Sequence, residues 1–153
     1  MELRRESLDS EPARALVAAL NAELTSLYPE PGATHFRLAA EETAAGVGAF
    51  LVGYVEQAPV ACGAVRKLDE ETAEIKRMFV LPAWRGLGFS TRMLAALEDE
   101  ARAVGAKRIV LETGERQREA LALYQRYGYR QMAPFGEYVG APLSVCMEKL
   151  LAR

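Results

Sequence analysis

The fold is decided by EIKRMFVLPAWRGLGFST, residues 74–91. Its first half reads as a buried strand that stops at Pro82, a residue that cannot donate a hydrogen bond within a sheet. Two glycines follow, and Phe89 and Met93 then begin an apolar face with helical spacing. A strand that passes through a glycine-bearing turn into a helix gathers backbone N–H groups at the positive helix end, which favours phosphate binding. A simple strand-to-helix turn is the alternative interpretation.

Strands and helices flank this junction on both sides. We predict strands over residues 1–8, 49–56, 60–68, 72–81, 107–113, 129–132 and 143–151. We predict helices over residues 88–104 and 117–127, and a first helix capped by Asp9 or Ser10, with Pro12 near its first turn and Leu16, Val17, Leu20 and Leu24 on its buried face. Residues 25–46 read as a loop with a short helix over 38–45, and residues 57–59 as a hairpin turn. The order predicts one α/β domain over residues 1–153, with a mixed sheet covered by helices.

Composition excludes several classes of function. The chain has 153 residues, with 19 basic and 21 acidic side chains and an isoelectric point near 5.6, which argues against nucleic-acid binding. Two cysteines and one histidine, His35, are too few for a disulfide framework or a zinc site, so we expect no metal. Residues 43–55, the longest charge-free run, are too short to span a membrane, and residues 1–12 lack the apolar stretch of a signal peptide. We therefore expect a cytoplasmic location and no membrane partner.

Two separated segments together resemble the GCN5-related N-acetyltransferase (GNAT) family. The family's acyl-CoA signature, Gln/Arg-x-x-Gly-x-Gly/Ala, is matched by Arg85, Gly86, Leu87, Gly88, Phe89 and Ser90, with serine in the last place. The second signature is a late helix with a Leu-Tyr pair that precedes a glycine and an aromatic residue, and it is matched by Leu123, Tyr124, Gly128 and Tyr129. Gln117 stands where the family often has an asparagine. The resemblance spans about residues 51–132.

The resemblance implies a fold and a cosubstrate. The expected fold is a mixed, mostly antiparallel sheet with a splayed central pair of parallel strands, flanked by helices. The expected cosubstrate is acetyl-CoA, with its diphosphate on the N–H groups of residues 85–90, charge from Arg85, and its pantetheine arm along Met78, Phe79 and Val80. Gln117 and Tyr124 are further expected contacts. The resemblance also leaves a homodimer as one assembly open to the chain.

Acyl transfer to an amine then needs three groups. An N–H donor, most simply that of Met78, would hold the oxygen of the tetrahedral transition state. Tyr124 would give a proton to the departing thiolate. The alternative is that Tyr124 only packs in the hydrophobic core and has no chemical role. A carboxylate, or a water that it orders, would take the proton of the amine, and the resemblance assigns this role to Glu74, in the segment Ala73-Glu74-Ile75. Strand periodicity predicts that Glu74 and Met78 share one face. The alternative for Glu74 is a structural ion pair with Lys76 or Arg66.

We expect the acceptor to be a small primary amine. The acetyl group would pass to it directly, in a ternary complex of protein, acetyl-CoA and acceptor. The segment 134–138 and the loop around Tyr28 border the acceptor pocket in this fold, so Tyr28, Phe135, Glu137 and Tyr138 are candidate contacts for a cationic amine. Two other functions stay open: acetylation of a protein N-terminus or lysine, and a non-catalytic acyl-CoA-binding regulatory domain. We expect Cys62 and Cys146 to be core residues and give His35 no catalytic role.

Overall fold

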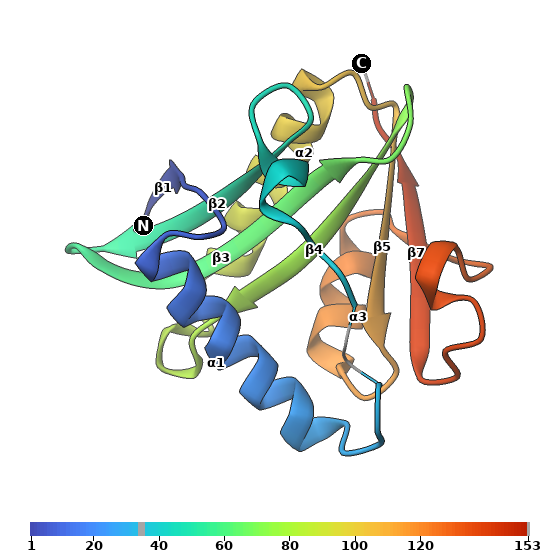
Figure 1. Cartoon of the computed structure of the whole chain (residues 1–153), viewed down its shortest axis with the longest axis horizontal. Coiled ribbons are helices and arrows are strands. Elements are labelled where there is room, and N and C mark those ends of the chain that lie inside the picture. Colours follow the sequence, from blue (N-terminus) through green and yellow to red (C-terminus); the bar gives the residue numbers. More distant parts are fainter. Residues whose placement is uncertain (34–35, 153) are drawn as a thin grey trace.

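The centre of the fold is the strand predicted at residues 72–81, which lies in the middle of a seven-stranded sheet in the computed structural model (Figure 1). The structure describes residues 1–33 and 36–152. The strands are β1 (Glu2–Arg5), β2 (Gly48–Val55), β3 (Ala58–Lys67), β4 (Thr72–Val80), β5 (Arg108–Gly114), β6 (Arg130–Met132) and β7 (Ser144–Leu150). The helices are α1 (Glu11–Leu27), α2 (Phe89–Ala103) and α3 (Arg118–Arg126), with short 3₁₀ turns η1 (Ala40–Thr43), η2 (Pro82–Trp84) and η3 (Gly136–Tyr138).

The strand order is β1-β2-β3-β4-β5-β7-β6, and β4 and β5 form the one parallel pair among the described strands. Their pairing ends at Ile75 and Leu111, although both strands continue. Beyond that point the two ribbons diverge (Figure 1). The prediction of a mixed α/β sheet with a splayed parallel pair is confirmed.

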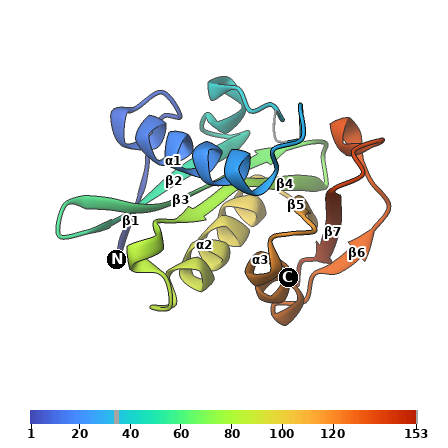
Figure 2. The same cartoon turned by 90° about the horizontal axis from the view of Figure 1, so that it is seen from below.

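Helices cover both faces of the sheet (Figure 2). On one face, α1 packs Leu16 and Leu20 against Phe50, Ala64 and other side chains of β2, β3 and β4. On the other face, α2 and α3 bury a second cluster built around Met93, Leu97, Ile109, Leu111 and Tyr124. Each helix presents the apolar face that its spacing predicts.

The local signals of the first helix act as expected. The Ser10 side chain accepts a hydrogen bond from the N–H of Ala13 at 3.3 Å, and Pro12 lies in the first turn. Three predictions of local structure were wrong. The strand expected over residues 1–8 is confined to β1. The helix expected at 38–45 is reduced to the short turn η1, and the hairpin turn lies at Glu56 and Gln57, both at positive φ, rather than at 57–59. A two-residue hairpin turn of type I′ needs positive φ at both positions, and glutamate and glutamine are not the residue types that usually indicate such a turn.

No helix in the described ranges has the length and apolar character required to cross a membrane.

Candidate functional site

A β-bulge in β4 organises the site. Pairing with β3 passes from Ala64–Lys76 to Cys62–Phe79, so Arg77 and Met78 together stand opposite Gly63. Arg77 adopts a φ of 58°, in the left-handed region that non-glycine residues seldom occupy. The extra residue breaks the alternation of side chains along the strand.

The predicted common face for Glu74 and Met78 is therefore wrong. Glu74 pairs across the sheet with Arg66 and lies on the α1 face, whereas Met78 packs into the α2 and α3 cluster. Four residues of regular strand would have kept both side chains on one side, and the single inserted position reverses the second of them.

Two hollows meet where β4 and β5 separate. The inner cavity, of about 100 Å³, is lined by Tyr28, Lys76, Arg77, Glu112, Thr113 and Tyr138, among others. The outer cleft, of about 750 Å³, runs from Phe79 and Val80 over residues 84–86 and 89–90 to the start of α3. Met78, Gln117 and Tyr124 line both hollows. A ligand in the cleft and another in the cavity would meet at these side chains.

The glycine loop, residues 85–90, forms one end of the cleft. Gly86 and Gly88 both have a φ of 81°, and a Cβ at either position would meet open space, so glycine serves the backbone conformation there. Within the described chain, no hydrogen bond uses the backbone N–H groups of residues 86–91. The first N–H groups of α2 have no partner inside the helix, and the helix dipole adds positive potential at the same end. This end of the cleft can therefore bind phosphate oxygens.

Arg85 is less available than the sequence implied. Its guanidinium contacts the Glu23 carboxylate at 2.9 Å, and its Nε donates to the Val80 carbonyl at 2.9 Å. Arg85 lines the cleft, but its charge is already paired with a helix α1 carboxylate. The main phosphate donors of the loop are thus backbone groups.

Tyr124 comes from α3 and is 6% exposed. Its hydroxyl donates to the Met78 sulfur at 3.6 Å, and its ring packs edge-on against Tyr129. Burial, with a smaller effect from the Glu112 carboxylate, raises the pKa of Tyr124 far above its ordinary value. The phenol is therefore protonated at neutral pH, at the junction of the two hollows.

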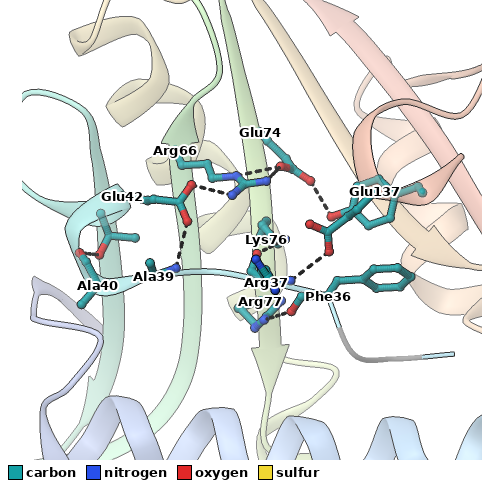
Figure 3. Close-up of polar contacts among 12 residues, drawn as sticks. Phe36, Arg37, Ala39, Ala40, Glu42, Arg66, Glu74, Lys76, Arg77 and Glu137 are labelled. Carbon is teal, nitrogen blue, oxygen red and sulfur yellow. Dashed lines mark hydrogen bonds and ion pairs between the residues drawn. The ribbon is translucent and has the colours of Figure 1, made fainter. Parts of the chain in front are cut away.

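Glu74 is fully buried inside a polar network (Figure 3). One carboxylate oxygen accepts a hydrogen bond from Arg66 Nε at 2.9 Å and forms an ion pair with Arg66 Nη2 at 2.8 Å, and the other accepts the Tyr138 hydroxyl at 2.6 Å. Arg66 continues to Glu42 at 2.5 Å, which ties η1 to the sheet. Glu74 lines neither hollow. Direct contact of this carboxylate with an amine is not what the geometry supports, because Tyr138 and Arg66 occupy its oxygens.

A different carboxylate, missed by the sequence reasoning, lies in the inner cavity. Glu112 is a β5 residue whose oxygen accepts the Ser144 hydroxyl at 2.5 Å. Burial raises the pKa of Glu112 above its ordinary value, against the opposite influence of Ser144, Lys76 and Arg77. The available signal was a charged residue directly after the apolar residues 109–111 of β5.

The predicted acceptor contacts separate into two groups. Tyr28 and Tyr138 line the inner cavity, as expected. Phe135 packs edge-on against Tyr138 at 5.1 Å, and the exposed Glu137 accepts the backbone N–H of Arg37 at 2.9 Å, so neither residue reaches the cavity lining. The side chains of Phe135 and Glu137 lie outside the lining of the inner cavity and help to hold it in place.

The remaining candidates behave as the composition suggested. Cys62 and Cys146 are free and buried, and burial raises the pKa of the Cys62 thiol to about 12. Trp84 stacks on Phe89 and lines the cleft. His35 lies outside the described residues.

Comparison with known proteins gives a consistent result. Residues 13–129 match the Acetyltransferase (GNAT) family. The chain is 38% identical, over 97% of both sequences, to an IAA acetyltransferase of Azospirillum brasilense. A solved structure from Klebsiella pneumoniae, described as an acyl-CoA N-acyltransferase, matches with a TM-score of 0.83 at 33% identity. The match covers 99% of this chain and 97% of that one. A GNAT acetyltransferase of Elizabethkingia anophelis, solved with acetyl-CoA bound, shares the fold with a TM-score of 0.70 at 17% identity, over 98% of this chain and 97% of that one.

Proposed function

Because the chain belongs to the GNAT acetyltransferase family, we propose that it transfers the acetyl group of acetyl-CoA to the primary amine of a small molecule, by direct transfer in a ternary complex. The observation that carries this proposal is the meeting of the two hollows at Met78 and Tyr124. The cleft takes the cosubstrate, the inner cavity takes the amine, and the acetyl carbon lies at their junction.

The cleft suits coenzyme A at both ends. The diphosphate binds the unpaired N–H groups of residues 86–91, and the pantetheine arm follows the edge of β4 at Phe79 and Val80. β4 can present backbone groups there because β5 has already diverged. Acetyl-CoA bound in the Elizabethkingia anophelis relative supports the same cosubstrate for this chain.

The chemistry needs only side chains and amides near the junction. Glu112, with its raised pKa, takes the proton of the bound ammonium, and the neutral nitrogen attacks the thioester carbon. Met78 has no partner residue in the register with β3, and its backbone N–H is the proposed donor to the developing oxyanion. As the C–S bond breaks, Tyr124 gives its proton to the thiolate and takes up the second proton of the attacking nitrogen, which leaves a neutral amide, a free thiol and a neutral phenol. Glu74 acts through Arg66 and Tyr138, which hold the cavity wall in place.

The size of the inner cavity favours a small acceptor over a protein. About 100 Å³ holds a short molecule, whereas a lysine or N-terminal peptide needs an open groove on the acceptor side. The Azospirillum brasilense relative, named an IAA acetyltransferase, supports a small-molecule acceptor as well.

The test is release of free thiol from acetyl-CoA with a panel of small amines and peptides, alongside calorimetric titration of coenzyme A. We expect binding of coenzyme A and turnover with small amines. Binding without turnover on any amine would indicate a regulatory acyl-CoA-binding domain, and turnover confined to peptides would indicate a protein acetyltransferase.

A further inference from the structure

The bulge gives the inner cavity two neighbouring cations. Lys76 and Arg77 are consecutive, so in a regular strand their side chains would point to opposite faces. With Arg77 at a φ of 58°, both reach the segment at residues 36–37 instead (Figure 3). The Lys76 ammonium donates to the Arg37 carbonyl, and the Arg77 guanidinium donates to the Phe36 carbonyl at 2.6 Å. Both side chains line the cavity.

Neither positive charge is neutralised by a direct partner. Lys76 is 6% exposed, and among the described residues the bonds of both cations go to neutral carbonyls and to no carboxylate. An ammonium has three donors and a guanidinium five, so each cation has donors left for a ligand. Burial lowers the pKa of Lys76 and of Arg77, which shows that their surroundings leave both charges poorly solvated.

The nearby carboxylates attract these cations electrostatically, but within the described ranges none of them forms a direct ion pair with Lys76 or Arg77. Glu74 is occupied by Arg66 and Tyr138, and Glu137 is exposed and bonded to the Arg37 amide. Among the described residues that line the inner cavity, Glu112 is the one acidic side chain, against the two cations Lys76 and Arg77. The cavity wall also holds the Thr113 hydroxyl, 5% exposed as a residue, whose oxygen has no hydrogen-bond partner within the described ranges. Buried polar groups are nearly always hydrogen-bonded, so the Thr113 hydroxyl is available to a polar group that enters the cavity.

We propose that the acceptor is a short amino acid, in the broad sense of a primary amine whose chain carries a carboxylate, and that Lys76 and Arg77 bind this carboxylate while the amine faces Glu112. This inference rests on the proposed function and narrows its substrate class. It replaces the expectation of a purely cationic amine, because the buried charges that face the cavity are mostly positive.

The experiment compares short α- and ω-amino acids with their primary amides, which have nearly the same shape and no negative charge. For the wild-type protein we expect kcat/KM to favour the acid over its amide by about tenfold or more, the effect of charge-assisted hydrogen bonds. In Arg77→Gln and Lys76→Met this ratio should fall toward one, while kcat/KM for the amide changes little. Arg77→Lys, which keeps the charge, should retain most of the preference.

The matched control is Arg130→Gln, which removes the same charge from an exposed side chain outside both hollows. It should leave the ratio unchanged, and thermal melts of every variant establish that it is folded. A wild-type protein that uses amides as well as acids would overturn the anion site and leave the proposed acetyltransferase intact.

A second readout does not depend on turnover. The N-acetyl derivative of an amino acid is titrated calorimetrically into the protein saturated with coenzyme A, beside the N-acetyl amide. Binding of the acid to the wild-type protein and its loss in Arg77→Gln support the anion site, even where no amine releases thiol and the proposed function fails. Absence of heat with the wild-type protein overturns it.

Discussion

Glu74 and Glu112 should respond in opposite ways to the same conservative change. Glu74→Gln removes the charge that faces Arg66, a side chain that is 14% exposed. Breaking a buried ion pair costs about 3 to 5 kcal/mol, and we expect about 2 to 3 kcal/mol here because Arg66 keeps Glu42 and the amide oxygen can still accept from Tyr138. At this chain length each kcal/mol lowers Tm by about 2 to 4 °C, so Tm should fall by about 4 to 12 °C.

The kinetic effect of Glu74→Gln should be small. Because Glu74 lines neither hollow, kcat/KM of the folded variant should stay within about tenfold of wild type, below the range of a lost general base. Glu112→Gln should instead lower kcat/KM by about 10²- to 10⁴-fold, since it removes the proposed proton acceptor.

The two variants should rank in the opposite order by thermal stability: Glu112→Gln, the less active variant, should be the more stable one. Burial raises the pKa of Glu112 in the folded protein, so its ionisation costs more in the folded than in the unfolded chain. The stability contributed by the protonated form is complete below the ordinary pKa of 4.5 and is lost as pH rises through the higher, folded pKa. The groups facing Glu112 enter this balance: Ser144, Lys76 and Arg77 favour the charged form, and Glu74 opposes it. At pH 7 and above, Glu112→Gln should therefore melt at or above the wild-type temperature.

The assay is steady-state thiol release from about pH 6 to about pH 9, together with thermal melts over the same range. A Glu74→Gln protein that melts like wild type but has lost more than a hundredfold in kcat/KM, beside an active Glu112→Gln protein, would refute the assignment and return the base to Glu74.

Three further outcomes follow from single contacts. Tyr124→Phe should lower kcat by about 10²-fold in the thiol assay while thermal melts shift little, because the hydroxyl contacts only a sulfur at 3.6 Å within the described protein; an unchanged kcat would remove its role as acid. Gly88→Ala imposes left-handed strain of about 1 to 2 kcal/mol and should weaken coenzyme A binding in calorimetry by about tenfold. The control is Gly140→Ala, where φ is 83° and the surroundings are equally open; this variant should melt at a lower temperature but bind coenzyme A with unaltered affinity. Equal affinities in both variants would contradict the phosphate role of the loop. Ser10→Ala should cost about 0.5 to 2 kcal/mol in denaturant unfolding because the Ala13 N–H loses its cap, and no loss would mean that the cap is not stabilising.

The elements were predictable wherever one physical rule acts without competition. The Phe89 and Met93 spacing, the Ser10 cap and Pro12 in the first turn of α1 correctly located the helices. Pro82 marked the end of β4, and the glycines of residues 85–90 marked the turn where the N–H groups of residues 86–91 have no hydrogen-bond partner within the described chain. These signals are local, so neighbouring elements had no means to override them.

The interior of the site was less predictable because it depends on contacts between distant segments. Glu112 reads in the sequence as one polar residue in a strand, and its role depends on Ser144 from β7 and on the divergence of β4 from β5. The sequence suggests that the Glu74 carboxylate is available to a substrate. In the structure this carboxylate accepts a hydrogen bond from the hydroxyl of Tyr138, 64 positions later in the chain. Residue type gave the chemistry of each group but not its access to a ligand.

The bulge at Arg77 accounts for the largest departure from the sequence prediction and also for the two-sided site. Without the extra residue, Met78 would lie on the α1 face beside Glu74, and Arg77 would point to the opposite face from Lys76. With it, Met78 faces Tyr124 and the cleft, while Lys76 and Arg77 both face the inner cavity. A positive φ at an arginine costs about 1 to 2 kcal/mol. The pattern of apolar residues in the sequence does not predict this conformation. Strain held at one position of a central strand, where it separates the acyl side from the acceptor side, is the kind of local cost that a functional site retains.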